Sequence, residues 1–298
     1  MKTTPSRRQF LAASALAASG LPATAHAQVS KTVAKAPPFK LGMVTYNTGA
    51  QWDLPTLLKV CKSTGIAAVE CRTTHKHGVE PSLNAAQRAE VKKQFAGSGV
   101  VFWGCGSVCE FQATDAAVVK KNIETCKEFV GLVHDLGGSG VKVRPNALPK
   151  GVTTEKTLEQ IGKALLECGK TAESFGIDIC VEVHGGGTQE PANMKTIMEQ
   201  CGHKSVGITW NSNPPDVKDG SVKWSFEMLK PWLKSCHIND LYKEHTGAYP
   251  YRELFTLLRE HGYDRYTMIE VGKTPPDVAT GEEFLRYYKA LWTELAKG

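Results

Sequence analysis

The sequence predicts a single-domain α/β protein, a (β/α)8 or TIM barrel. Eight short runs rich in β-branched residues alternate with eight segments whose apolar residues recur at spacings of three and four. The runs are almost continuously apolar, as strands buried on both faces of a parallel sheet must be. No GxGxxG motif follows the first run, and no change of composition marks a second domain. We therefore expect a closed barrel rather than a doubly wound open sheet.

The elements follow one another in regular order. The predicted strands are 40–46, 66–71, 100–106, 140–144, 177–184, 206–210, 234–238 and 266–271. The predicted helices cover about 53–63, 84–95, 116–136, 154–175, 190–200, 222–230, 251–260 and 281–295. Asp53 is expected to cap the first helix, in which Leu54, Leu57 and Leu58 show the helical spacing.

The first 27 residues have the pattern of a bacterial twin-arginine signal peptide. The run SRRQFL at residues 6–11 contains the arginine pair, a small apolar stretch continues to Ala18, and Ala25-His26-Ala27 provides a cleavage site. We expect a signal peptide over 1–27, a linker over 28–38 and the barrel over 39–298. The alternative is a disordered N-terminus that contains two arginines by chance.

This pattern predicts export to the periplasm, with the twin-arginine export machinery as a partner. No later segment contains 18 consecutive apolar residues, so no membrane association is expected after cleavage. Twin-arginine export moves proteins that have already folded in the cytoplasm.

Charge and cysteine content exclude several other classes. Lysine and arginine total 36 and acidic residues 30, and removal of Lys2, Arg7 and Arg8 with the signal leaves a net charge of about +3. This balance indicates no nucleic-acid surface. The nine cysteines are odd in number and form no CxxC motif, which argues against a disulfide framework or a zinc knuckle. A single disulfide is left open.

Polar residues occur where the later strands end, the edge at which such barrels place their active sites. Glu182 and His184 alternate at the end of the fifth strand, His237 ends the seventh and Glu270 ends the eighth. A carboxylate inside an apolar strand is costly to bury without a partner. Glu182, His237 and Glu270 together would suit a divalent cation such as Mn²⁺, Co²⁺, Mg²⁺ or Zn²⁺.

The segments VEVHGG, ITWNSN, CHIND and MIEVG resemble the sugar-phosphate isomerase/epimerase family of xylose isomerase-like barrels. The resemblance extends over about residues 40–295. It implies a metal held by residues of strands 5 to 8, here Glu182, Asn211, His237 and Glu270, with Glu182 and Glu270 as the catalytic carboxylates. Asn211 stands where the family usually has aspartate, and Pro214 stands where a histidine is often found. An amide oxygen can coordinate a metal but contributes no charge.

Further polar residues are candidates for substrate binding. Lys142 and Arg144 end the fourth strand with alternate spacing, although a salt bridge to Glu182 would also explain one of them. Lys243 stands where family members often have a substrate-binding arginine. The remaining candidates are His184, Glu70 and His75.

These observations favour an enzyme that isomerises or epimerises a non-phosphorylated carbohydrate, polyol or keto-sugar by carboxylate-mediated proton abstraction. A mechanistically related lyase is equally compatible, because elimination proceeds from the same intermediate. Export argues against sugar phosphates, which are cytoplasmic. The alternative is a non-catalytic sugar-binding or accessory barrel whose metal site has degenerated at Asn211. Family members often form homo-oligomers, and the sequence leaves this open.

Overall fold

The computed structural model describes residues 36–298, which form one (β/α)8 barrel. The predicted signal peptide and most of the predicted linker lie outside the described residues. The eight strands close in sequence order, each parallel to its neighbours, and β8 pairs with β1. Their bounds are β1 Lys40–Val44, β2 Ala68–Arg72, β3 Val101–Gly106, β4 Gly140–Val143, β5 Asp178–Glu182, β6 Val206–Trp210, β7 Leu233–Ile238 and β8 Tyr266–Ile269. The predicted fold class and the order of its strands are confirmed.

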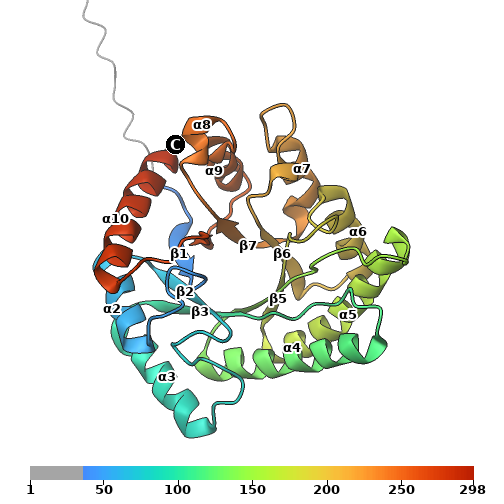
Figure 1. Cartoon of the computed structure of the whole chain (residues 1–298), viewed down its shortest axis with the longest axis horizontal. Helices are drawn as coiled ribbons and strands as arrows, with labels where there is room; N and C mark the ends of the chain where they lie inside the picture. Colours follow the sequence, from blue (N-terminus) through green and yellow to red (C-terminus); the bar gives the residue numbers. More distant parts are fainter. Residues whose placement is uncertain (1–35) are drawn as a thin grey trace, which may run out of the picture. The chain divides into compact units, whose positions relative to one another are not determined.

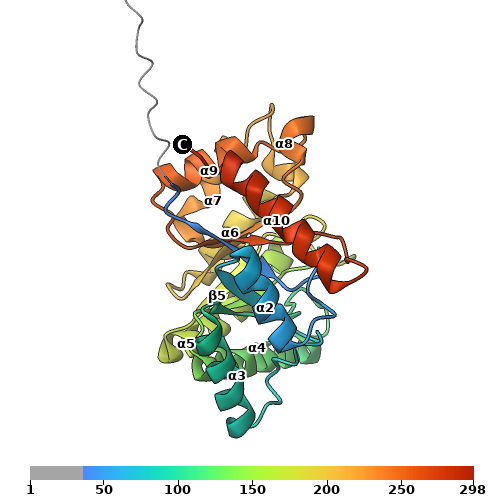
Figure 2. The same ribbon diagram turned by 90° about the vertical axis from the view of Figure 1, so that its left-hand side faces the viewer.

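The helices surround the strands (Figure 1). They are α2 Leu54–Thr64, α3 Ala85–Ser98, α4 Ala116–Leu136, α5 Thr154–Phe175, α6 Pro191–Cys201, α7 Lys223–Leu229, α8 Lys243–Thr246, α9 Tyr251–Glu260 and α10 Val278–Leu295. Asp53 caps α2 as predicted, with its side chain accepting a hydrogen bond from the Thr56 amide. The last helix, α10, packs beside α2, so the ring closes between the first and the last of the described helices (Figure 2).

Three short elements were not predicted from the sequence. They are α8 and the 3₁₀ turns η1 Pro214–Asp216 and η2 Lys230–Trp232. Each has three or four residues, too few for an apolar period to be visible. Several strands also end earlier than predicted. Arg144, His184 and Glu270 follow their strands rather than belonging to them, so their side chains start from loops at the barrel mouth.

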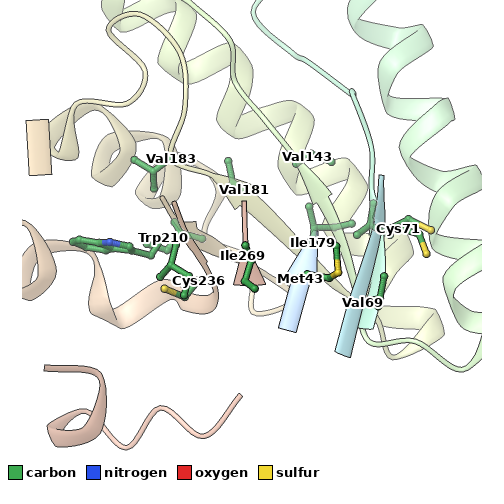
Figure 3. Packing of buried hydrophobic residues seen from close by; sticks show 14 of the residues in the cluster. Met43, Val69, Cys71, Val143, Ile179, Val181, Val183, Trp210, Cys236 and Ile269 are labelled. Atoms are coloured by element: carbon green, nitrogen blue, oxygen red, sulfur yellow. The ribbon is translucent and has the colours of Figure 1, made fainter. Parts of the chain in front are cut away.

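The core has two parts. A large cluster lies between the strands and the helices, and Figure 3 shows some of its side chains, including Val181, Trp210 and Ile269. A small cluster contains Trp103 and Met268 with Val44, Ala68 and Cys180. Trp103 fits there because Gly140 faces it: a Cβ on that glycine would lie 2.7 Å from the indole ring.

All nine cysteines are free and buried, so the disulfide that the sequence left open is not formed. In the described part of the chain, none of the helices combines the length and the apolar character that a membrane span requires.

Candidate metal centre

A cavity of about 690 Å³ opens at the carboxyl ends of the strands. Its wall includes Lys142 in β4 and Arg144 directly after it, Glu182 at the end of β5, Asn211 after β6 and Glu270 after β8. In a parallel barrel the strand ends converge on one mouth, which is why residues as far apart in the sequence as Arg72 and Glu270 meet here.

Glu182, His237 and Glu270 meet beneath this cavity as the sequence predicted. Each offers one ligand atom, and these atoms all lie within 4.8 Å of one another. His237 Nδ1 lies 3.3 Å from Glu270 Oε2 and 3.9 Å from Glu182 Oε1. The side chains of His237 and Glu182 are almost fully buried, whereas that of Glu270 is 13% exposed. Two carboxylates and an imidazole this close together suit a divalent cation.

The orientation of His237 is set from behind by Glu70. His237 Nε2 donates a hydrogen bond to Glu70 Oε2 over 2.9 Å, and both side chains are inaccessible to solvent. His237 Nδ1, by contrast, is buried and has no hydrogen-bond partner. A carboxylate that holds one imidazole nitrogen while the other is free is the usual support of a metal-binding histidine. The residues present therefore fit a metal ion.

Charge around His237 supports the same conclusion. Burial lowers the pKa of His237, but the Glu70 and Glu270 carboxylates outweigh burial and raise the pKa well above its ordinary value. The surroundings of the ring thus favour a positive charge, whether a proton or a metal ion provides it.

Glu182 is paired with a buried lysine. Lys142 Nζ donates to Glu182 Oε2 over 2.8 Å, and the two side chains are 2% and 3% exposed. Burial alone would raise the pKa of Glu182, yet Lys142 and His237 hold that pKa well below its ordinary value. The ion pair therefore keeps Glu182 ionised, and Lys142 occupies one side of the carboxylate that a metal would use.

Asn211, predicted as the fourth ligand, turns its amide nitrogen towards the centre. Asn211 Nδ2 donates to Glu182 Oε1 over 3.3 Å, while Asn211 Oδ1 accepts from Asn239 Nδ2 over 3.4 Å. Asn239 Oδ1 in turn accepts from the Tyr251 hydroxyl. The chain of donors ends at a carboxylate that can only accept, which fixes the direction of both amides. In this arrangement Asn211 anchors Glu182, and it would have to flip its amide to coordinate a metal.

Four predicted substrate-binding residues line the cavity. They are Lys142, Arg144, His184 and Lys243. Arg144 is bound to Glu110, with its Nη2 3.0 Å from Glu110 Oε1. His184 Nδ1 is buried without a hydrogen-bond partner.

Two other predicted substrate-binding residues lie elsewhere. Glu70 is completely buried behind His237 and is absent from the cavity wall. Gly106 makes room for it, since a Cβ there would lie 2.6 Å from Glu70 Oε1. His75 is also absent from the wall, and its Nδ1 lies 2.9 Å from Thr45 Oγ1. Strand alternation could not distinguish a side chain in the cavity from one directed at a neighbouring strand.

Some aromatic side chains line the cavity and others belong to the core. Tyr46 lines the cavity, whereas Trp103 and Trp210 are buried in the core. Tyr288 and Phe284 of α10 also line the cavity. Both lie far from any strand end in the sequence, so strand-end placement did not predict them.

The family model described as "Xylose isomerase-like TIM barrel" matches residues 58–288. Among solved structures, a D-psicose 3-epimerase crystallised with D-fructose matches with a TM-score of 0.71 and 16% identity, over 87% of this chain and all of that chain. A 3-keto-D-glucoside 4-epimerase from E. coli matches with a TM-score of 0.69 and 15% identity, over 86% and 99% of the two chains. The IOLI protein with a bound zinc atom matches with a TM-score of 0.69 and 18% identity, over 87% and 98%. No curated protein matches the sequence.

Proposed function

Because the chain belongs to the xylose isomerase-like TIM-barrel family, we propose that it is a divalent-metal-dependent isomerase, epimerase or mechanistically related lyase. Its substrate would be a non-phosphorylated carbohydrate, polyol or keto-sugar. The observation that carries the proposal is the grouping of Glu182, His237 and Glu270, whose ligand atoms lie within 4.8 Å. The sugar epimerases and the zinc-bound protein of the same fold support a sugar substrate and a metal.

In this proposal Glu182, His237 and Glu270 hold the cation. When bound, a cation such as Mn²⁺, Co²⁺, Mg²⁺ or Zn²⁺ supplies Lewis acidity that stabilises negative charge on the substrate's carbonyl and hydroxyl oxygens. Glu70 keeps the proton on His237 Nε2, so that Nδ1 is the nitrogen directed at the centre.

The two catalytic carboxylates differ in their surroundings, which suggests different roles. Glu182 is neutralised by Lys142, whereas Glu270 has no lysine or arginine partner among residues 36–298. Glu270 is therefore the better base. It takes the proton from the carbon next to the substrate carbonyl, and the electron pair of the C–H bond moves towards the carbonyl oxygen.

The buried Lys142–Glu182 pair is the proposed proton donor. Lys142 Nζ carries protons 2.8 Å from the Glu182 carboxylate, so the pair can deliver one to the substrate as a unit. Delivery to the opposite face of the same carbon gives epimerisation, and delivery to the neighbouring carbon gives isomerisation. Loss of a β-substituent gives elimination.

Proton exchange tests this proposal. Metal-loaded protein is incubated in D₂O with a panel of free sugars and 3-keto sugars, and deuterium next to the carbonyl is measured by NMR. We expect incorporation with at least one sugar, and its loss in Glu270→Gln. Glu283→Gln, an exposed glutamate on α10, is the matched control and should exchange normally. Absence of exchange with every sugar would reject the proposed chemistry.

The second candidate is a non-catalytic sugar-binding barrel. The orientation of Asn211 and the neutralisation of Glu182 by Lys142 favour it, since both reduce the negative charge available to a metal. Metal-free protein that binds sugars without exchanging their protons would support this candidate over the enzyme.

We also propose that the chain is exported to the periplasm by the twin-arginine machinery. The proposal depends on residues 1–27 of the sequence, which lie outside the described structure. Cell fractionation tests it. The native chain should appear in the periplasm as a shortened form, and a variant with Arg7→Lys and Arg8→Lys should remain in the cytoplasm. Equal export of both would contradict the proposal.

A further inference from the structure

The cavity contains more positive charge than its proposed chemistry requires. Three acidic side chains line it, against five basic ones. The basic residues are Arg72, Lys142, Arg144, Lys243 and Lys273. Neutral sugars are bound through hydroxyl groups and need no such excess. Only those cations that have no acidic partner within the protein are available to a ligand.

The two cations on the β4 side are neutralised within the protein. Lys142 is paired with Glu182 at 2.8 Å, and Arg144 is paired with Glu110 at 3.0 Å. The charge of each is therefore compensated by a glutamate before any ligand binds. The excess therefore resides in the other three basic residues.

Arg72, at the end of β2, has no acidic partner among the described residues. Its guanidinium carbon lies 5.4 Å from the centre of the Tyr46 ring, which also lines the cavity. The acids nearest to it in sequence have other partners: Glu70 accepts from His237 over 2.9 Å, and Glu80 accepts from the Thr73 hydroxyl and the Thr74 amide. Arg72 is thus held on an aromatic face with its hydrogen-bond donors free.

Lys243 and Lys273 likewise form no ion pair within residues 36–298. They follow β7 and β8, and the strand order places β7, β8, β1 and β2 side by side. The loops after β1 and β8 also touch, since the Thr48 hydroxyl donates to the Lys273 carbonyl oxygen over 3.4 Å. The three unpaired cations therefore share one side of the cavity. Two acids also line this side: Glu270, which belongs to the proposed metal centre, and Asp240, which is exposed and accepts from the Tyr242 amide.

We propose that the β7–β8–β1–β2 side of the cavity binds the carboxylate of an acidic sugar, with Arg72 as its main contact and Lys243 and Lys273 as supporting charges. The inference rests on the proposed function and narrows its substrate class to uronate-like or aldonate-like sugars. A planar guanidinium matches a carboxylate with two parallel hydrogen bonds. The reacting carbon would then face Glu270, which follows β8 on the same side.

A phosphate is the less suitable anion. Barrels that bind phosphate often use the loops after strands 7 and 8 together with a helix N-terminus. Here the helix after β8 is α10. Asp277 already caps its N-terminus, because Asp277 Oδ1 accepts from the Thr280 amide over 2.8 Å. A second anion at this end would meet the Asp277 carboxylate.

Calorimetry with matched ligands tests the inference. Metal-loaded protein is titrated with pairs in which a carboxylate replaces one hydroxymethyl group: D-glucuronate with D-glucose, D-galacturonate with D-galactose, and D-gluconate with D-glucitol. The methyl ester of D-glucuronate and D-glucose 6-phosphate are added. We expect at least one acid to bind roughly tenfold more tightly than its neutral parent, and the ester to bind like the parent.

The variants Arg72→Gln and Lys273→Gln should remove most of this preference without weakening the neutral parent. Lys93→Gln, an exposed lysine on α3, is the matched control and should leave the preference intact. The inference is overturned if no acid binds more tightly than its parent, if the phosphate is preferred, or if Arg72→Gln weakens acid and parent equally.

These outcomes are independent of the test by proton exchange. Deuterium exchange on a neutral sugar without any preference for acids would refute the carboxylate site and leave the proposed chemistry intact. A strong preference for acids without exchange would refute the chemistry and retain the site.

Discussion

Lys142 Nζ lies 2.8 Å from Glu182 Oε2, and the two side chains are 2% and 3% exposed. A buried ammonium thus touches a carboxylate that the metal proposal also assigns to the cation. In the absence of metal the two charges compensate each other, and each would be costly to bury alone. When metal binds, the cation and the lysine must share Glu182.

Lys142→Gln should therefore have opposite effects on stability and on metal binding. Without metal, the variant leaves Glu182 buried without its counter-ion, and we expect a loss of about 3 kcal/mol in the free energy of unfolding. The same variant should bind Mn²⁺ or Zn²⁺ about tenfold more tightly, because a competing charge is gone. Urea unfolding with chelator present and metal competition titrations measure the two quantities.

The control for this variant is Arg144→Gln. Arg144 and Glu110 also form an ion pair at the mouth, but their side chains are 22% and 26% exposed, so both quantities should change little. Unchanged metal affinity in Lys142→Gln would show that Lys142 and the metal do not compete.

Glu70→Gln should weaken metal binding although Glu70 is not a ligand. The native carboxylate can only accept, and so keeps the proton on His237 Nε2. A glutamine amide can donate to Nε2 instead and shift the proton to Nδ1, the atom that faces Glu182 and Glu270. We expect metal affinity to fall by about 10- to 100-fold.

Two measurements check the effect of Glu70→Gln. Metal titration gives the affinity, and ¹⁵N NMR of the imidazole of His237 shows which nitrogen holds the proton. Glu80→Gln is the control, because Glu80 binds the Thr73 hydroxyl and the Thr74 amide rather than a histidine. A native tautomer and native affinity in Glu70→Gln would contradict the assigned role.

Asn211→Asp should strengthen metal binding and lower the stability of the metal-free protein. Asn211 Nδ2 donates to Glu182 Oε1 over 3.3 Å, and an aspartate would replace that donor with a second negative charge. We expect the metal-free variant to be less stable by about 1–3 kcal/mol and metal to bind at least about tenfold more tightly.

Thermal unfolding with and without Mn²⁺ measures both effects. Asn213→Asp serves as the control on the same loop. Asn213 Nδ2 donates to the Val183 carbonyl oxygen over 2.6 Å, so this variant should lose stability without gaining metal affinity. Equal metal affinity in Asn211→Asp and the native protein would place residue 211 outside the coordination sphere.

Stability should fall between about pH 4 and pH 8 because of Asp216. Burial raises the pKa of Asp216 from 3.8 to about 8, against the opposing hydrogen bonds from the Asn213 amide and the Tyr249 hydroxyl. Across this interval the unfolded chain releases a proton that the folded protein retains. A rise in pH therefore favours unfolding by up to about 1.4 kcal/mol per pH unit, and the effect ends above pH 8.

Asp216→Asn removes this titration while it retains an acceptor oxygen. Urea unfolding at pH 5, 6.5 and 8 should show a smaller loss of stability with pH in the variant than in the native protein. Asp219→Asn, an exposed aspartate on the same loop, should follow the native curve. Identical pH dependence in Asp216→Asn and the native protein would show that Asp216 titrates normally.

The sequence was sufficient for the barrel because the barrel follows from local patterns. Strand runs such as Val206–Trp210 and helices such as Ala116–Leu136 have the residue types and periods that these elements need. Alternating elements of this kind close in only one common way, so Glu182, His237 and Glu270 could be placed at one mouth before any coordinates were known. Short elements such as Lys243–Thr246 could not be predicted, because four residues show no period.

Which side chains contact one another was decided only by the tertiary structure. The sequence placed Glu70 and His75 with the substrate, but only the packed barrel shows that Glu70 holds His237 and that His75 lies beside Thr45. Alternation along a strand specifies the face on which a side chain lies, whereas its partner depends on how neighbouring strands are aligned. The sequence by itself determined the fold and the grouping of Glu182, His237 and Glu270 at the barrel mouth. The tertiary structure determined which of them are paired, buried or free, because those properties depend on distances between strands.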